Sequence, residues 1–167
     1  MADEDQQSQR PAPRNKILSH LPTAIKIIEL ILAIFAIGLA VDPMNSFQQM
    51  FNRPRFKLDD AATIYVTVAG YILINGLFVI SHMLGDRVPK RTLIIFAFVG
   101  AIMHLVAGSL MVHNWRHMNG SSHHYVYNNE IYASKQYVDM LISAAVFTFV
   151  NAVVFVVEII AIIKWSS

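Results

Sequence analysis

The sequence feature that most constrains this chain is the apolar run Met140–Ile163, MLISAAVFTFVNAVVFVVEIIAII, in which Glu158 is the one charged residue. At a rise of about 1.5 Å per residue, a helix of this length crosses a bilayer core of about 30 Å. The other way to bury such a helix is a large soluble core. A chain of 167 residues cannot build one around this run and three similar ones, so the run predicts a membrane span.

Composition agrees with a membrane protein, because 55% of the residues are hydrophobic and only 14% are charged. The chain has no cysteine, which excludes disulfides, thiolate metal sites and cysteine nucleophiles. Its basic residues are spread along the chain, so we expect no nucleic-acid partner. The sequence has no nucleophile elbow, phosphate loop, HExxH motif or paired-carboxylate arrangement, and we therefore expect neither enzymatic activity nor a cofactor.

Four apolar runs divide the chain. We expect a disordered tail over 1–19 and a four-span membrane domain over 20–165, with spans at about 21–41, 61–84, 92–112 and 138–163. Pro22 is expected at the start of the first span, and Asp42-Pro43 at its end. Two longer loops would lie on one face, with the tight turn GDRVPKR and both tails on the other. The fold class is therefore all-α, a four-helix transmembrane bundle.

The basic residues next to the spans predict the orientation. The short turn DRVPKR is strongly basic, which places it and both tails in the cytosol by the positive-inside rule. Asn119-Gly120-Ser121 is a glycosylation sequon in the second long loop, and it agrees with an extracellular position for that loop. Asn119 is thus a candidate glycosylation site, although it is close to the membrane.

Ionisable side chains inside the spans are the default functional candidates, because they are costly in lipid. Lys26 and Glu29 are three residues apart and share a helix face. Together with His82 and Glu158 they lie within about two helical turns of the predicted cytosolic surface. We interpret these four residues as an intramembrane polar cluster that joins the first and last helices, with a proton or ion relay as the alternative.

His104 lies deeper, on a stripe of small residues in the third span. The stripe comprises Ala97, Gly100, Ala101, Ala107 and Gly108. Small residues at this spacing let helices approach closely, and a polar side chain among them can form a hydrogen bond to a neighbouring helix. The predicted interhelical polar contacts join His104 with Asn75, Thr148 and Asn151. A ligand or proton site at His104 is the alternative.

The second long loop, from His113 to Tyr137, is rich in histidine and aromatic residues. The alternation in Tyr125-Val126-Tyr127, followed by Asn128-Asn129 and Glu130-Ile131-Tyr132, fits a small β-hairpin. We expect Trp115, Tyr125, Tyr127 and Tyr132 to form a protein-contact surface. His113 and His117 are four residues apart and could share a metal on a continuing helix, but no carboxylate or cysteine completes the set, so no metal site is predicted.

Three segments carry a family resemblance: AIKIIEL at the start of the first span, GSLMVHNW at the end of the third, and YVYNNE before the fourth. Claudins, tetraspanins and connexins all carry loop cysteines, which this chain lacks. The chain resembles the MARVEL-like group of tetraspan junction and vesicle proteins, and within it the arthropod snakeskin-type proteins of smooth septate junctions. The resemblance covers residues 23–164.

This resemblance implies a structural plasma-membrane protein at epithelial cell–cell junctions. Its extracellular loops would contact other junctional membrane proteins, or a second copy of the chain, and contribute to a paracellular barrier. Two alternatives remain open. One is a small channel, transporter or auxiliary subunit that uses His104 and the Glu29/Glu158 pair. The other is a MARVEL-type vesicle-trafficking protein.

Overall fold

The chain folds into long helices that run side by side. The computed structural model describes residues 16–51, 57–86, 88–120 and 131–165. Within these residues the elements are α1 (Lys16–Phe51), α2 (Leu58–Met83), α3 (Lys90–Gly120) and α4 (Ile131–Trp165). Each contains a stretch that is long and apolar enough to span a membrane, namely Leu21–Met44, Leu58–Met83, Lys90–His117 and Gln136–Lys164. The predicted all-α four-helix bundle is confirmed.

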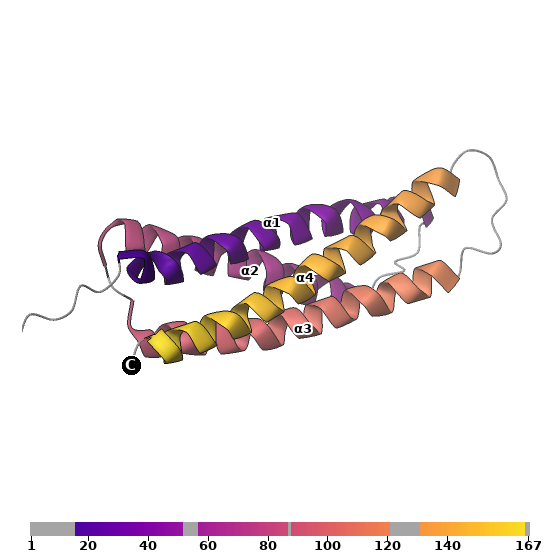
Figure 1. Ribbon diagram of the computed structural model, residues 1–167. Helices are drawn as coiled ribbons and strands as arrows, with labels where there is room; N and C mark the ends of the chain where they lie inside the picture. Colours follow the sequence, from indigo (N-terminus) through magenta and orange to yellow (C-terminus); the bar gives the residue numbers. More distant parts are fainter. Residues whose placement is uncertain (1–15, 52–56, 87, 121–130, 166–167) are drawn as a thin grey trace, which may run out of the picture.

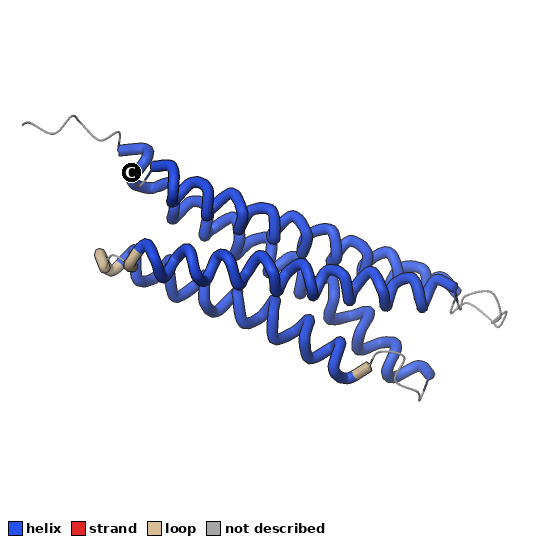
Figure 2. Tube along the Cα trace, turned by 90° about the horizontal axis from the view of Figure 1, so that it is seen from below, coloured by secondary structure: helices blue, strands red, loops and turns tan. Residues whose placement is uncertain are grey.

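The helices form an elongated bundle in which α4 crosses between α1 and α3 and contacts both (Figure 1). α2 completes the bundle by packing against α1 and α3. The start of α1, the turn between α2 and α3 and the end of α4 lie at one end, which we call the tail end (Figures 1 and 2). The opposite end, where α1 and α3 finish and α2 and α4 begin, is the loop end.

α1 is longer than predicted at both ends. It begins at Lys16, so residues 16–19 belong to the helix and not to the tail, and Pro22 lies inside it. It also continues through Pro43 to Phe51, so the prediction that Asp42-Pro43 ends the helix was wrong. Proline removes one backbone hydrogen bond, but membrane helices tolerate this because neighbouring helices and local adjustments compensate. Pro43 is itself buried in the bundle.

α3 and α4 also extend into the predicted second loop. α3 continues to Gly120 and α4 begins at Ile131, since a helix does not have to end where its apolar run ends. The hairpin prediction was therefore wrong for Ile131 and Tyr132, which open α4, and the described residues contain no strand. The rest of the predicted hairpin, including Tyr125 and Tyr127, lies outside the described residues.

The tight turn at the tail end has a defined geometry. α2 stops at Met83, and Gly85 has φ +87°, a left-handed conformation that glycine adopts without steric cost. The Gly85 N–H donates to the His82 carbonyl (3.1 Å), and the Asp86 N–H donates to the Ser81 carbonyl (3.1 Å). This pair of bonds is a Schellman motif, which satisfies the last carbonyls of the helix. The turn thereby sets α2 and α3 antiparallel.

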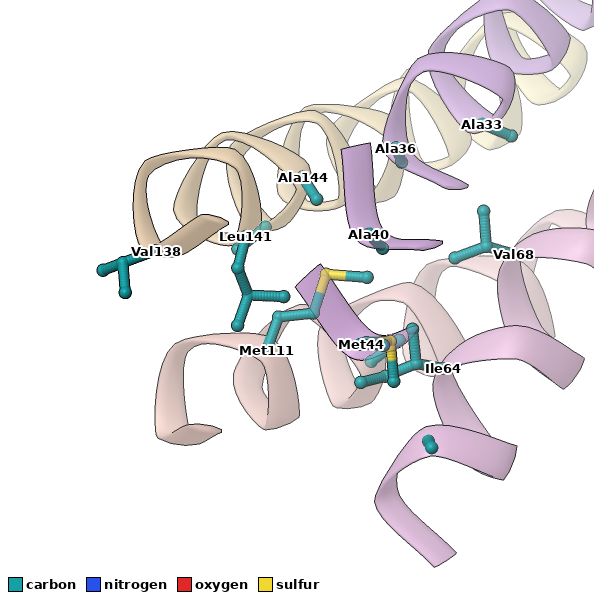
Figure 3. Packing of buried hydrophobic residues seen from close by; sticks show 13 residues of the cluster. Ala33, Ala36, Ala40, Met44, Ile64, Val68, Met111, Val138, Leu141 and Ala144 are labelled. Atoms are coloured by element: carbon teal, nitrogen blue, oxygen red, sulfur yellow. The ribbon is translucent and has the colours of Figure 1, made fainter. Parts of the chain in front are cut away.

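A hydrophobic core fills the loop-end half of the bundle. Three small residues on α1 are at most 1% exposed and let the neighbouring helices approach: Ala33, Ala36 and Ala40. Beside them, larger side chains from all four helices meet: Met44, Ile64, Met111 and Leu141 (Figure 3). Large apolar side chains on the outer faces, such as Leu73 and Val153, are exposed. In a bilayer these outward side chains meet lipid.

Candidate functional site

An ion cluster lies inside the tail-end half of the bundle. Lys26 Nζ is 2.9 Å from Glu29 Oε2 on the same helix and 2.7 Å from Glu158 Oε2 on α4. Both carboxylates are completely buried and the lysine is 4% exposed. The structure thus brings together three of the four residues of the predicted intramembrane cluster and links α1 to α4 through them.

His82 lies outside this buried set. It is in the last turn of α2, and its side chain is exposed. Its depth along the chain matches that of Lys26, and seven residues, about two turns, place it on the same side of α2 as the fully buried Asn75. Because His82 is in the last turn of α2, its side chain lies at the end of the bundle, beyond the cover of the neighbouring helices.

Two aromatic rings complete the surroundings of Lys26. The ammonium nitrogen is 5.5 Å from the centroid of the Phe78 ring on α2 and 5.2 Å from that of the Phe155 ring on α4. Cations are attracted to the faces of such rings, and the attraction is stronger without water. Sequence reasoning missed both phenylalanines. Each is three residues from a polar residue that was singled out, Asn75 or Glu158, and this helical spacing was the available signal.

A second polar contact lies near the middle of the bundle. His104 Nδ1 is 2.9 Å from the Gly100 carbonyl oxygen, and its Nε2 is 3.2 Å from Asn151 Nδ2 on α4. A carbonyl can only accept, so Nδ1 carries the proton and donates. Nε2 then accepts from the amide of Asn151, as the structure orients that amide. Both ring nitrogens of this neutral histidine are engaged, and His104 joins α3 to α4.

The other two predicted interhelical contacts are placed differently. Thr148 is buried, and its hydroxyl donates to the Ala144 carbonyl of its own helix (2.8 Å) and approaches Met111 Sδ on α3 (3.6 Å). Asn75 is fully buried, but neither its amide nitrogen nor its amide oxygen has a hydrogen-bond partner among the described residues. Buried polar atoms are usually satisfied, so an orphan amide at this position is unusual.

An aromatic layer surrounds His104. The Tyr71 ring meets the His104 and Phe155 rings edge-on, with centroids 5.2 Å away in both cases, and the His104 and Phe155 centroids are 5.1 Å apart. The Tyr71 hydroxyl donates to the Phe96 carbonyl of α3 (3.1 Å). Sequence reasoning missed Tyr71, which lies four residues before Asn75 and hence on the same face of α2.

Glycine makes this layer possible. A Cβ atom on Gly100 would lie 2.7 Å from Tyr71 Cε1 and 3.0 Å from Phe155 Cε1. On Gly108 it would lie 3.0 Å from the Phe149 ring. At Gly100 and Gly108 of the predicted stripe, α3 therefore closely approaches aromatic side chains of α2 and α4.

A further polar contact at the loop end was missing from the sequence predictions. Asn114 on α3 donates to Asp60 Oδ2 on α2 (3.2 Å) and to the Leu110 carbonyl (2.9 Å). Neither residue stood out, because each lies at the end of an apolar run, where a polar residue is ordinary. Their pairing depends on how α2 and α3 dock.

The predicted contact surface is only partly described. Trp115 lies in α3, not in a loop, and its half-buried ring packs against the loop-end core because α3 extends beyond its predicted end. Asn119 falls in the last turn of α3, just beyond the membrane-spanning stretch. His113 and His117 are exposed on the same helix. Among the described residues, no three histidine, cysteine, aspartate or glutamate side chains group together as a metal site.

The family of this chain is identified by comparison with known proteins. No curated protein and no solved structure gave a significant match to the chain. The model of the MARVEL membrane-associating domain matches residues 18–161, which is most of the chain and includes the first three spans and nearly all of the fourth. MARVEL domains are membrane-associating and non-enzymatic. The chain is a multi-pass membrane protein and belongs to the MARVEL family.

Proposed function

We propose that this protein is a structural component of epithelial cell–cell junctions of the smooth septate type. In this role it contributes to a paracellular barrier through the segments at its loop end, with both tails in the cytosol. Membership of the MARVEL family supports a membrane-associating role. The resemblance of three segments to snakeskin-type junction proteins supports the narrower assignment. Other junctional membrane proteins, or a second copy of the chain, are the partners we propose.

The observation that carries a structural role is the filled layer at Gly100. Tyr71, His104 and Phe155 are in mutual ring contact there, and the space beside Gly100 does not admit even a methyl group. An ion path between α2, α3 and α4 would have to pass through this layer. Tight packing of this kind suits a rigid scaffold that holds its ends in a fixed arrangement.

A channel, transporter or auxiliary subunit is the second candidate, because ionisable side chains are buried within the described spans: Lys26, Glu29, His104 and Glu158. Purified protein in proteoliposomes separates the two functions. A channel or transporter predicts ion or proton flux that His104→Ala or Glu158→Gln abolishes. A scaffold predicts flux no greater than that of empty liposomes.

Localisation tests the junctional role directly. A tagged copy expressed in a polarised epithelium should concentrate at lateral cell contacts, and replacing residues 125–132 with a Gly/Ser linker of equal length should remove it from them. Retention of the variant at cell contacts would contradict a role for this segment. Intracellular puncta with the unaltered protein would instead identify the vesicle-trafficking function.

A further inference from the structure

The ion cluster contains one more negative charge than positive charge. Glu29 and Glu158 share the single ammonium of Lys26 through their Oε2 atoms. Among the described residues, Lys26 is the one buried lysine or arginine. Burying an uncompensated charge away from water is so costly that groups in this position usually become neutral.

The other polar groups described on the helices around the pair donate elsewhere or have exposed side chains. On α2, the Tyr71 hydroxyl donates to a carbonyl of α3, and Phe78 offers only its ring to Lys26. On α3, both nitrogens of His104 are engaged elsewhere. His82 and Lys164, which lie towards the tail end of α2 and α4, have exposed side chains.

Oxygen atoms without partners lie inside the same cluster. Oε1 of Glu29 and Oε1 of Glu158 are buried and accept no hydrogen bond from the described residues. Both side chains reach the same ammonium nitrogen through Oε2, at 2.9 Å for Glu29 and 2.7 Å for Glu158, so the two carboxyl groups are neighbours. Independently, the buried amide of Asn75 has no partner in this part of the chain, and it lies on α2 between Tyr71 and Phe78, the residues that meet Phe155 and Lys26.

We propose that Glu29 and Glu158 together hold one proton. One of the two side chains is then a neutral carboxyl and the other a carboxylate, beside Lys26. The proton neutralises the cluster and gives one orphan oxygen a donor. A metal ion fits less well, because Ca²⁺ and Mg²⁺ take at least six ligands, and Lys26 already occupies two of the four carboxylate oxygens. This proposal does not depend on the junctional role.

Infrared spectroscopy of the full chain in lipid nanodiscs at neutral pH tests the proposal. We expect a C=O stretching band of a protonated carboxyl that shifts in D₂O and disappears in both Glu29→Gln and Glu158→Gln. Asp139→Asn, which changes an exposed carboxylate on α4, should leave the band unchanged. Absence of the band in the unaltered protein would overturn the proposal. So would loss of the band on adding Na⁺ at constant pH, which would identify a metal-cation site instead.

The thermal stability of glutamine variants tests the charge balance of the cluster. Each single glutamine variant leaves one carboxylate for Lys26, so each should keep most of the thermal stability of the unaltered protein in detergent. The double variant Glu29→Gln/Glu158→Gln leaves Lys26 without a counter-ion and should unfold at a clearly lower temperature than either single variant. Equal midpoints for single and double variants would contradict a cluster that needs one net carboxylate charge.

Discussion

Replacing Gly100 with alanine measures how tightly the aromatic layer is closed. The added methyl would lie 2.7 Å from Tyr71 Cε1 and 3.0 Å from Phe155 Cε1. Neither ring is free to move aside, because Tyr71 donates to the Phe96 carbonyl (3.1 Å) and Phe155 is completely buried. Overpacking of this kind costs about 1–3 kcal/mol.

Helix propensity acts in the opposite direction. Alanine is favoured over glycine inside a helix by about 1 kcal/mol. We expect the overpacking cost to lie in the upper part of its range, at about 2–3 kcal/mol, because both rings are held in place. The net effect of Gly100→Ala is then a free energy of unfolding lower by about 1–2 kcal/mol. Gly38 provides the matched control, since its position is exposed on α1 and a Cβ there meets nothing within 4 Å. Gly38→Ala should be neutral or stabilising, by up to about 1 kcal/mol.

Equilibrium unfolding in mixed micelles, followed by circular dichroism, gives both values. Gly108→Ala should fall between the other two, because its Cβ would lie 3.0 Å from one ring only, that of Phe149. The variant Tyr71→Leu/Gly100→Ala should recover part of the loss, and the double-mutant cycle isolates the coupling between the two positions. Equal stability of the Gly100 and Gly38 variants would refute the argument that this layer is closed.

Three further changes test the polar contacts. Lys26→Met leaves the buried carboxyl pair of Glu29 and Glu158 without its cation and should cost about 3–5 kcal/mol, visible as reduced cell-surface biotinylation; normal surface delivery would contradict it. His104→Leu leaves the amide of Asn151 unsatisfied and should cost about 1–3 kcal/mol, most of which the double change with Asn151→Leu should recover in unfolding experiments. Asp60→Ala removes one acceptor of Asn114 at a partly buried position and should cost about 1 kcal/mol or less, so a larger loss of stability would show that this contact holds α2 on α3.

The fold followed from the sequence because a short chain with four long apolar runs can shield all of them from water only in a membrane. The ends of the helices did not follow so directly. Pro43 would end most soluble helices, yet the membrane helix continues through it. Ile131 and Tyr132 follow the possible turn Asn128-Asn129 as the second strand of a hairpin would, yet they open α4. Local preference was outweighed in both cases by continuity with a long membrane helix.

The level of each polar residue along its span was predictable, but whether its side chain is buried inside the bundle was not. Counting along the spans placed Lys26, Glu29 and Glu158 at one level, and the structure joins them. The same count placed His82 there, although its side chain is exposed. The aromatic partners, such as Phe155, were missed because an aromatic residue in an apolar run is as suited to lipid as to a protein interior. Which face turns inward depends on the other three helices.

The position of α4 between α1 and α3 has a consequence for biogenesis. α4 is the last of the four helices to leave the ribosome, yet it carries Glu158 and Asn151, the partners of Lys26 and His104. Until α4 inserts, Lys26 has only Glu29 on its own helix, and the Nε2 atom of His104 lacks the donor that Asn151 provides. A three-helix intermediate therefore keeps polar groups inside the membrane without the partners that α4 supplies. Insertion of the fourth helix provides these partners, so it both closes the bundle and satisfies its polar interior.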